Sequence, residues 1–166
     1  MQVGYEKALK AFMRLRKDIT APSLHPFYIM ADSRRSQLLK PKFFIYQEEE
    51  ELFSHGFHIS YLKGTGYCLI QSPLGYGGPV ASCTDPGFLR NAWEEYYNWC
   101  LDNKVIAELI RFHPLLENWC YYNGLVTDNR ETVWIDLHSK PLMPTYSARA
   151  RTAIRKAKNN GLKVEW

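Results

Sequence analysis

Residues 85–112 read DPGFLRNAWEEYYNWCLDNKVIAELIRF and combine the pattern of a helix with that of a strand. Asp85-Pro86 opens the helix, because proline is favoured in the first helical turn. Apolar side chains then recur at intervals of three or four residues, which predicts a buried helix face. This face consists of Phe88, Leu89, Ala92, Trp93, Tyr96, Trp99 and Cys100. The run Lys104–Phe112 is typical of a strand, although two charged residues interrupt its apolar character.

Upstream of this stretch, residues 4–17 carry apolar positions at helical spacing, with basic residues between them. His25-Pro26 ends that helix and leads into a compact irregular or short helical segment. Three strands are expected next, at Phe43–Tyr46, at Phe53–Tyr61 with an interruption at His55-Gly56, and at Tyr67–Gln71. The acidic run between the first two predicts a solvated turn.

Downstream of it, Cys120–Val126 and Thr132–Leu137 are predicted to be two further strands. A final helix is expected over about Thr145–Asn159, with Asn160-Gly161 as its stop signal. Leu162–Trp166 has the pattern of the beginning of another strand. About seven short strands and three or four helices predict an α/β (α+β) fold with a mixed, mainly antiparallel sheet flanked by helices. At 166 residues we expect one such domain over the whole chain, 1–166.

The composition excludes several classes of protein. A net charge of +4 is far below the basic excess of a dedicated nucleic-acid binder. The four cysteines are widely spaced without a CxxC pair, which argues against a zinc site and favours reduced thiols. No apolar run approaches the ~20 residues that a membrane span needs, and basic residues interrupt the N-terminal segment. We therefore expect a cytoplasmic protein without a metal or a membrane span.

The most distinctive segment is SPLGYGGP, Ser72–Pro79. Three glycines and two prolines in eight residues exclude the interior of an ordinary strand. Such a loop can turn backbone N–H groups toward an anion or a carbonyl, or it can be a tight structural turn with Tyr76 packed on top. It matches no nucleotide-binding fingerprint. Tyr76, Gly77 and Gly78 are the candidate substrate-binding residues.

A second segment is RFHPLLEN, residues 111–118, which supplies the candidates Arg111, His113 and Asn118. Alternation places Arg111 at the end of an apolar row, where Asp136 or a bound anion could be its partner. His113 is either a hydrogen-bonded structural residue or a general base. On the opposite face, Glu108 is either a base with a raised pKa or the partner of a lysine.

The third segment is the basic helix near the C-terminus. A narrow face of small side chains, Ala150, Ala153, Ile154 and Ala157, would let it pack closely on a sheet. Arg149, Arg151 and Arg155 are candidate phosphate-binding residues, because arginine forms bidentate contacts and a helix N-terminus attracts phosphate. The alternative is a solvated basic face.

Taken in order, four stretches of the chain resemble the FemAB-like branch of the GNAT (acyl-CoA N-acyltransferase) superfamily. They are His25-Pro26, Ser72–Pro79, RFHPLLEN at 111–118 and YSARARTAIRKAKNNGL at 146–162. The resemblance implies a GNAT-like fold and the transfer of an acyl or aminoacyl group to a small-molecule amine acceptor. The donor would be acyl-CoA or aminoacyl-tRNA, with tRNA as a partner, and some such enzymes modify peptidoglycan precursors of the cell envelope. These enzymes have two GNAT-like halves, so the resemblance implies that this chain is the N-terminal half, is inactive alone and needs the second half.

One departure from the superfamily pattern bears on the donor. The place of the pyrophosphate loop [QR]xxGx[GA] holds HSKPLMPT, residues 138–145, whose two prolines remove two N–H donors. This favours an acceptor- or phosphate-binding role for the glycine-rich loop and the basic helix over pantetheine binding. No catalytic residue is predicted. The alternative function is a non-catalytic binding or scaffold domain whose basic helix docks a partner or RNA.

Overall fold

The computed structural model describes residues 1–129, 138 and 143–163. The chain divides into two compact units, Met1–Asp128 and Asn129–Trp166. The first unit contains all the strands named below and three α-helices, and the second contains the basic helix.

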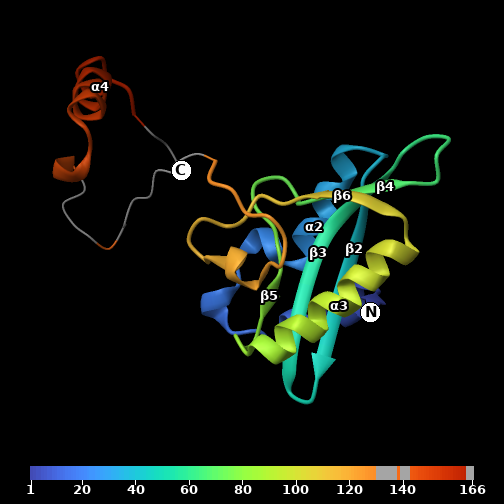
Figure 1. Ribbon diagram of the computed structural model, residues 1–166. Helices are drawn as coiled ribbons and strands as arrows, with labels where there is room; N and C mark the ends of the chain where they lie inside the picture. The colour runs from blue at the N-terminus through green and yellow to red at the C-terminus, as the bar shows by residue number, and fades with distance from the viewer. Residues whose placement is uncertain (130–137, 139–142, 164–166) are drawn as a thin grey trace. The chain divides into compact units, whose positions relative to one another are not determined.

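A six-stranded sheet forms the centre of the first unit (Figure 1). Its strands are β1 (Gln2–Val3), β2 (Lys40–Glu48), β3 (Glu51–Tyr61), β4 (Cys68–Gln71), β5 (Val80–Ala81) and β6 (Val105–Leu109). The order is β1-β2-β3-β4-β6, and β5 pairs with β3. The β4–β6 pair is parallel and the other pairs are antiparallel. The predicted mixed, mainly antiparallel α/β sheet is confirmed.

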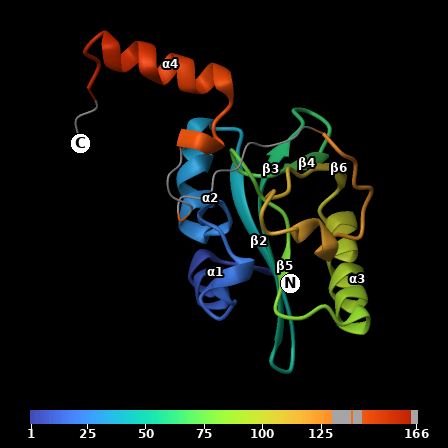
Figure 2. The same cartoon turned by 90° about the vertical axis from the view of Figure 1, so that its left-hand side faces the viewer.

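Helices cover both faces of this sheet. Figures 1 and 2 show α1 (Tyr5–Phe12) and α2 (Pro26–Asp32) on one face and α3 (Pro86–Asp102) on the other. Short 3₁₀ helices connect these elements, at Lys17–Ile19, Pro22–Leu24, Ser33–Arg35 and Asn118–Tyr121. Among the described residues, no helix has both the length and the apolar character that crossing a bilayer requires.

The alternation of side chains along β2 and β3 explains why the sheet is covered on both sides. Phe44, Phe53 and Phe57 pack into a cluster with the aromatic face of α3. Phe43 and Leu52, one position away, pack in the clusters beneath α1 and α2. Successive side chains of a strand point to opposite faces, so both strands supply two separate cores.

The predicted helices and strands before residue 112 are all present, but the first helix ends at Phe12 and not near residue 17. The predicted interruption at His55-Gly56 is also wrong. Strand β3 runs without interruption through His55-Gly56, both paired with β2. The glycine is needed there because a Cβ at position 56 would overlap Ile29 Cδ1 of α2. It marks a close approach between a helix and a strand, as interior glycines often do.

Further along the chain, the strand predicted over Cys120–Val126 is wrong. Asn118–Tyr121 form a 3₁₀ helix, and an irregular segment follows it. The indole Nε1 of Trp93 donates to the Tyr121 carbonyl oxygen at 2.7 Å and holds this turn against α3. The strand predicted at Thr132–Leu137 lies outside the described residues. Leu162 and Lys163 are not in a strand, and the rest of the strand expected there lies outside the described residues.

In the second unit, the predicted basic helix is present as α4 (Ala148–Asn159), preceded by a 3₁₀ helix at Met143–Thr145. The Ser147 hydroxyl caps it by accepting from the Ala150 N–H at 3.2 Å. Gly161, with φ of 72°, follows its end as expected. Of the predicted core face, Ala150, Ile154 and Ala157 are half-buried and Ala153 is exposed, and the packing of this face on a sheet stays a prediction.

Candidate functional site

Two loops meet at the carboxyl ends of the parallel strands β4 and β6. Ser72–Pro79 follows β4, and the segment 110–118 follows β6. The pairing continues beyond the strands, because the Ser72 N–H donates to the Leu109 carbonyl at 3.1 Å and the Gly77 N–H to that of Arg111 at 2.8 Å. Ligands commonly bind at the carboxyl ends of parallel strands in open α/β sheets. This edge of the sheet is therefore a candidate ligand-binding site.

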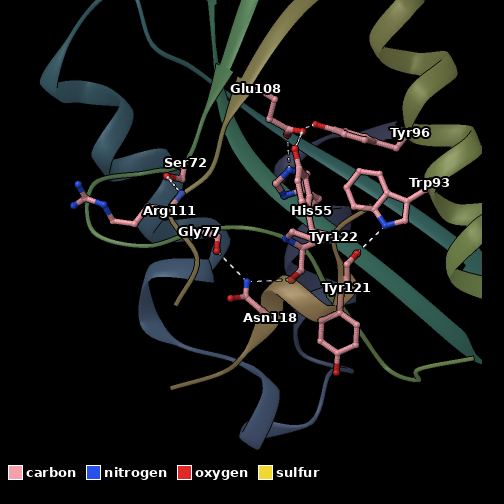
Figure 3. A network of polar contacts seen from close by, with 11 residues as sticks. His55, Ser72, Gly77, Trp93, Tyr96, Glu108, Arg111, Asn118, Tyr121 and Tyr122 are labelled. Carbon is pink, nitrogen blue, oxygen red and sulfur yellow. Dashed lines mark hydrogen bonds and ion pairs between the residues drawn. The ribbon is translucent and has the colours of Figure 1, made fainter. Parts of the chain in front are cut away.

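The side chain of Asn118 joins the two loops. It is fully buried, and its Nδ2 donates to the carbonyl oxygens of Gly77 at 2.9 Å and Pro79 at 3.1 Å. Its Oδ1 accepts from the backbone N–H of His113 at 2.9 Å. Figure 3 shows the amide reaching from the 3₁₀ helix toward the loop carbonyl. These bonds give Asn118 a structural role, and its contact with substrate stays a prediction.

The glycines of the Ser72–Pro79 loop meet two different requirements. Gly75 and Gly78 have positive φ, at 90° and 102°. A Cβ at Gly78 would also lie 2.8 Å from both Asn118 Nδ2 and Phe112 Cδ1. Gly77 does not have positive φ, but a Cβ there would lie 2.6 Å from Ser72 Cβ. Positive φ and close approach together explain why glycine is needed at these positions.

Helix α2 holds the other side of the same loop. Tyr28 Oη donates to the Leu74 carbonyl at 2.8 Å, and the Leu74 N–H donates to Asp32 Oδ2 at 2.9 Å. Asp32 in turn pairs with Arg35 Nε at 3.0 Å. His25 caps this helix, with its Nδ1 accepting from the Phe27 N–H at 3.1 Å. Three of the four stretches that carry the family resemblance thus lie in one connected region.

The remaining candidates of this region differ in their surroundings. The rings of Tyr76 and His113 pack edge to face with their centroids 5.2 Å apart, so Tyr76 packs on the segment after β6. His113 Nδ1 accepts from the Leu115 N–H at 3.2 Å, and burial lowers the pKa of His113. Arg111 is exposed and forms no ion pair among the described residues, while Asp136, its suggested partner, lies outside them.

A buried polar network lies beside these loops, beneath α3 (Figure 3). Glu108 Oε1 accepts from Tyr96 Oη at 2.6 Å and contacts His55 Nε2 at 3.0 Å, and its Oε2 accepts from Tyr122 Oη at 3.3 Å. The side chain of His55 is fully buried, and that of Glu108 is 13% exposed. The predicted lysine partner for Glu108 is wrong, since its partners are a histidine and two tyrosines.

The network determines the charge of this carboxyl. Burial alone would raise the pKa of Glu108, but the contacts with His55, Tyr96 and Tyr122 outweigh it, so the pKa lies below its usual value. The predicted raised pKa is therefore wrong. Burial and the nearby carboxylate raise the pKa of Tyr122 to about 12 and that of Tyr96 well above its usual value. Glu108 is thus a carboxylate that accepts from two protonated phenols.

A surface cleft leads to this network between α3 and residues 122–124, and we call it the α3 cleft. Its volume is about 390 Å³, and Trp93, Tyr96, Tyr97, Tyr122 and Glu108 are among its lining residues. A second hollow of about 430 Å³ shares Trp93 and Tyr122 with it. Aromatic walls around a few converging polar groups are typical of small-molecule sites.

The candidate phosphate-binding residues of α4 differ in their exposure and hydrogen bonds. Arg149 and Arg155 are exposed, whereas Arg151 is half-buried. Arg151 Nη1 donates to the carbonyl oxygens of Tyr146 and Pro144, the latter at 3.3 Å. These bonds tie the helix to the turn that precedes it, so they compete with phosphate for Arg151.

Sequence reasoning did not identify His55, Tyr96 or Tyr122 as a polar cluster. The signal that was available is a histidine at an α3-facing position of an apolar strand, together with a glutamate in another strand of the same sheet. Such residues need partners when they are buried. Among the described residues, no group of three or more His, Cys, Asp or Glu could hold a metal ion.

No family model matches the chain, and neither a curated protein nor a solved structure matches it. The resemblance to FemAB-like proteins stays a prediction.

We predict that Asn118→Asp lowers the free energy of unfolding by about 3 kcal/mol or more. A carboxylate cannot donate to the two loop carbonyls and would bring an unpaired charge into the interior. Chemical denaturation at pH 7 measures the change. Asn98→Asp, on the exposed side of α3, is the matched control and should change stability by less than about 1 kcal/mol. Equal effects at the two positions would contradict the structural role of Asn118.

We also predict that Glu108→Gln lowers stability by about 2–4 kcal/mol at pH 7, because the donors around it lose an ionised acceptor. The pKa of Glu108 is lowered in the folded state, so its contribution is complete above the ordinary value of 4.5 and is lost as pH falls through the native pKa. Urea denaturation of both proteins as a function of pH should show a difference that shrinks in acid. Glu94→Gln, exposed on α3, should show little difference at any pH.

Proposed function

We propose that this chain is an acyl- or aminoacyl-transferase domain of FemAB/GNAT-like type, acting on an amine acceptor. One observation carries the proposal: a glycine-rich loop held by hydrogen bonds lies at the carboxyl ends of two parallel strands, together with an exposed Arg111 that forms no ion pair in the described part of the chain. Modification of peptidoglycan precursors or another cell-envelope component is the proposed context. Acyl-CoA or aminoacyl-tRNA is the proposed donor.

Rigidity supports this role, because acyl transfer gains much of its rate from holding two reactants in attack geometry. Asn118 fixes the loop from one side, and Tyr28 and Asp32 fix it from the other. A loop held in this way keeps its backbone dipoles in place, which is the requirement for stabilising a developing oxyanion. The second half of a two-half enzyme would complete the cleft.

Arg111 would anchor the anionic part of the donor. Its backbone N–H donates to Ser72 Oγ at 3.2 Å, so its position relative to the loop is fixed while its guanidinium is exposed. In Figure 3 the guanidinium extends away from Glu108. An exposed guanidinium at this place suits the phosphates of coenzyme A or of tRNA, which it can contact through two parallel hydrogen bonds.

We expect Arg111→Ala to lower transfer from the correct donor by about 10-fold or more, because one charge-assisted contact to phosphate contributes roughly 1.5–3 kcal/mol. The thermal midpoint should stay within about 2 °C, since the side chain is exposed. The measurement is transfer of labelled acyl or aminoacyl groups to amine acceptors, with the chain alone and with the complete gene product. Lys10→Ala, an exposed cation on α1, is the control and should keep full activity.

A large loss of stability in Arg111→Ala would assign the residue a structural role. Absence of transfer with every donor, together with tight binding of another protein, would favour a scaffold domain instead of an enzyme.

The second candidate function is RNA binding through α4, as a scaffold or to hold an aminoacyl-tRNA donor. Five of the twelve residues of α4 are Arg or Lys and none is acidic. Arg149, Arg155, Lys156 and Lys158 are exposed. Exposed cations on one helix are the electrostatic footprint of binding to a phosphate backbone.

If α4 binds tRNA, affinity should fall steeply with salt, with a slope of log K against log[salt] of roughly −2 to −3 for about four phosphate contacts. Replacing Arg149 and Arg155 together by Gln should reduce the magnitude of the slope by about 1.4, because two contacts are lost. Filter binding of the full chain to tRNA between low and moderate salt measures this. The control replaces Lys7 and Lys10 of α1 by Gln. An equal reduction in the control would show diffuse attraction only.

A further inference from the structure

The α3 cleft has features that the loop site does not use. Four aromatic residues of its lining come from two places in the chain, Trp93, Tyr96 and Tyr97 from α3 and Tyr122 from the irregular segment. Glu108 is the carboxylate between them. Figure 3 shows the side chains of Tyr96 and Tyr122 reaching the end of the Glu108 side chain. The α3 cleft thus combines a carboxylate with aromatic walls.

The carboxylate of Glu108 keeps an open acceptor position. Its Oε1 is engaged by both His55 and Tyr96, while among the described residues Oε2 has only the long 3.3 Å bond from Tyr122. A carboxylate offers about four acceptor positions, and the described residues supply three donors. Glu108 lines the cleft and 13% of its side chain is exposed, so part of this side chain is accessible from solvent.

The two phenols around Glu108 are neutral donors, because burial raises the pKa of both Tyr96 and Tyr122. The contacts with His55, Tyr96 and Tyr122 lower the pKa of Glu108 itself, so the acidic group that lines the cleft is a carboxylate.

We propose that the α3 cleft binds a primary ammonium group, with Glu108 as its counter-ion and the faces of the aromatic residues as its walls. An ammonium donates to carboxylate oxygen and is attracted to aromatic faces, especially that of tryptophan. If the proposed function holds, this ligand is the amine acceptor. Only this identification of the ligand rests on the proposed function. Binding itself requires no donor and is measured without one.

Two further charged residues line the cleft, and one of them allows a cationic ligand to be distinguished from an anionic one. Arg90 and Glu94 are both exposed and both line it. A cationic ligand is repelled by Arg90, whereas an anionic ligand would be attracted to it. The effect of removing Arg90 therefore distinguishes the two kinds of ligand.

The test is NMR titration of the full chain at pH 7 with butylammonium, butan-1-ol and butyrate, following the indole N–H of Trp93. Butylammonium should give saturable shifts, butan-1-ol should bind about 10-fold more weakly or not at all, and butyrate should not bind. Equal affinity for butan-1-ol would show an apolar cleft only and would overturn the proposal.

Three substitutions test the charged residues and an aromatic wall of the cleft. Glu108→Gln should weaken butylammonium binding by about 10-fold or more, and Arg90→Gln should strengthen it by about 2- to 5-fold. Tyr97→Ala should weaken it by about 2- to 5-fold through the loss of an aromatic face. Tyr67→Ala, which removes an exposed ring outside the cleft, should change nothing. If Glu108→Gln does not fold, Arg90→Gln and Tyr97→Ala carry the test.

Two results would overturn the proposal. Binding of butyrate that Arg90→Gln abolishes would make the cleft an anion site, and a folded Glu108→Gln protein with unchanged ammonium affinity would remove the counter-ion. An active transferase without ammonium binding here would refute this inference alone. Ammonium binding without any transfer would refute the proposed function alone.

Discussion

The buried amide of Asn118 is the interaction on which the loop region depends. Its three hydrogen bonds connect the segment after β6 to the loop after β4, and no other polar residue type supplies two donors and an acceptor in this space. Gly78 lies so close to this amide that a Cβ there would collide with it. The glycine-rich loop and the asparagine thus require one another, although Asn118 and Pro79, which share a hydrogen bond, are 39 residues apart in the sequence.

This constraint extends to the buried network beneath α3. Phe112, which lies against Gly78, packs edge to face on Tyr122 at 5.2 Å, and Tyr122 donates to Glu108. The position of the carboxylate therefore depends on packing that begins at the loop. Buried polar groups destabilise the fold unless all their hydrogen-bond partners are in place. A substitution at Asn118 that displaces Phe112 and Tyr122 would therefore also disturb the hydrogen bonds of Glu108.

The sequence predicted the local features well and the long-range ones poorly. The α3 helix follows from the Asp85-Pro86 start and from apolar spacing, and the Asp85 carboxylate does accept from the Phe88 N–H at 2.7 Å. Residues 120–126 have a strand-like composition, but the Trp93 indole and the buried Asn118 hold this region in a 3₁₀ turn and an irregular segment. The partners of Glu108 could not be predicted, because they come from β3, α3 and residue 122, and only the folded sheet brings them together.

The arrangement of charge along the segment 108–111 connects the two candidate sites. Glu108 points to the α3 side and is enclosed, whereas Arg111, three residues later, is exposed beside the glycine-rich loop. Alternation along an extended chain keeps such side chains on opposite faces, so they do not neutralise each other. Within one short segment, a carboxylate that lines the α3 cleft and a guanidinium that forms no ion pair among the described residues then lie on opposite faces. The proposed transferase would use the carboxylate to hold the ammonium acceptor and the guanidinium to hold the phosphate of the donor.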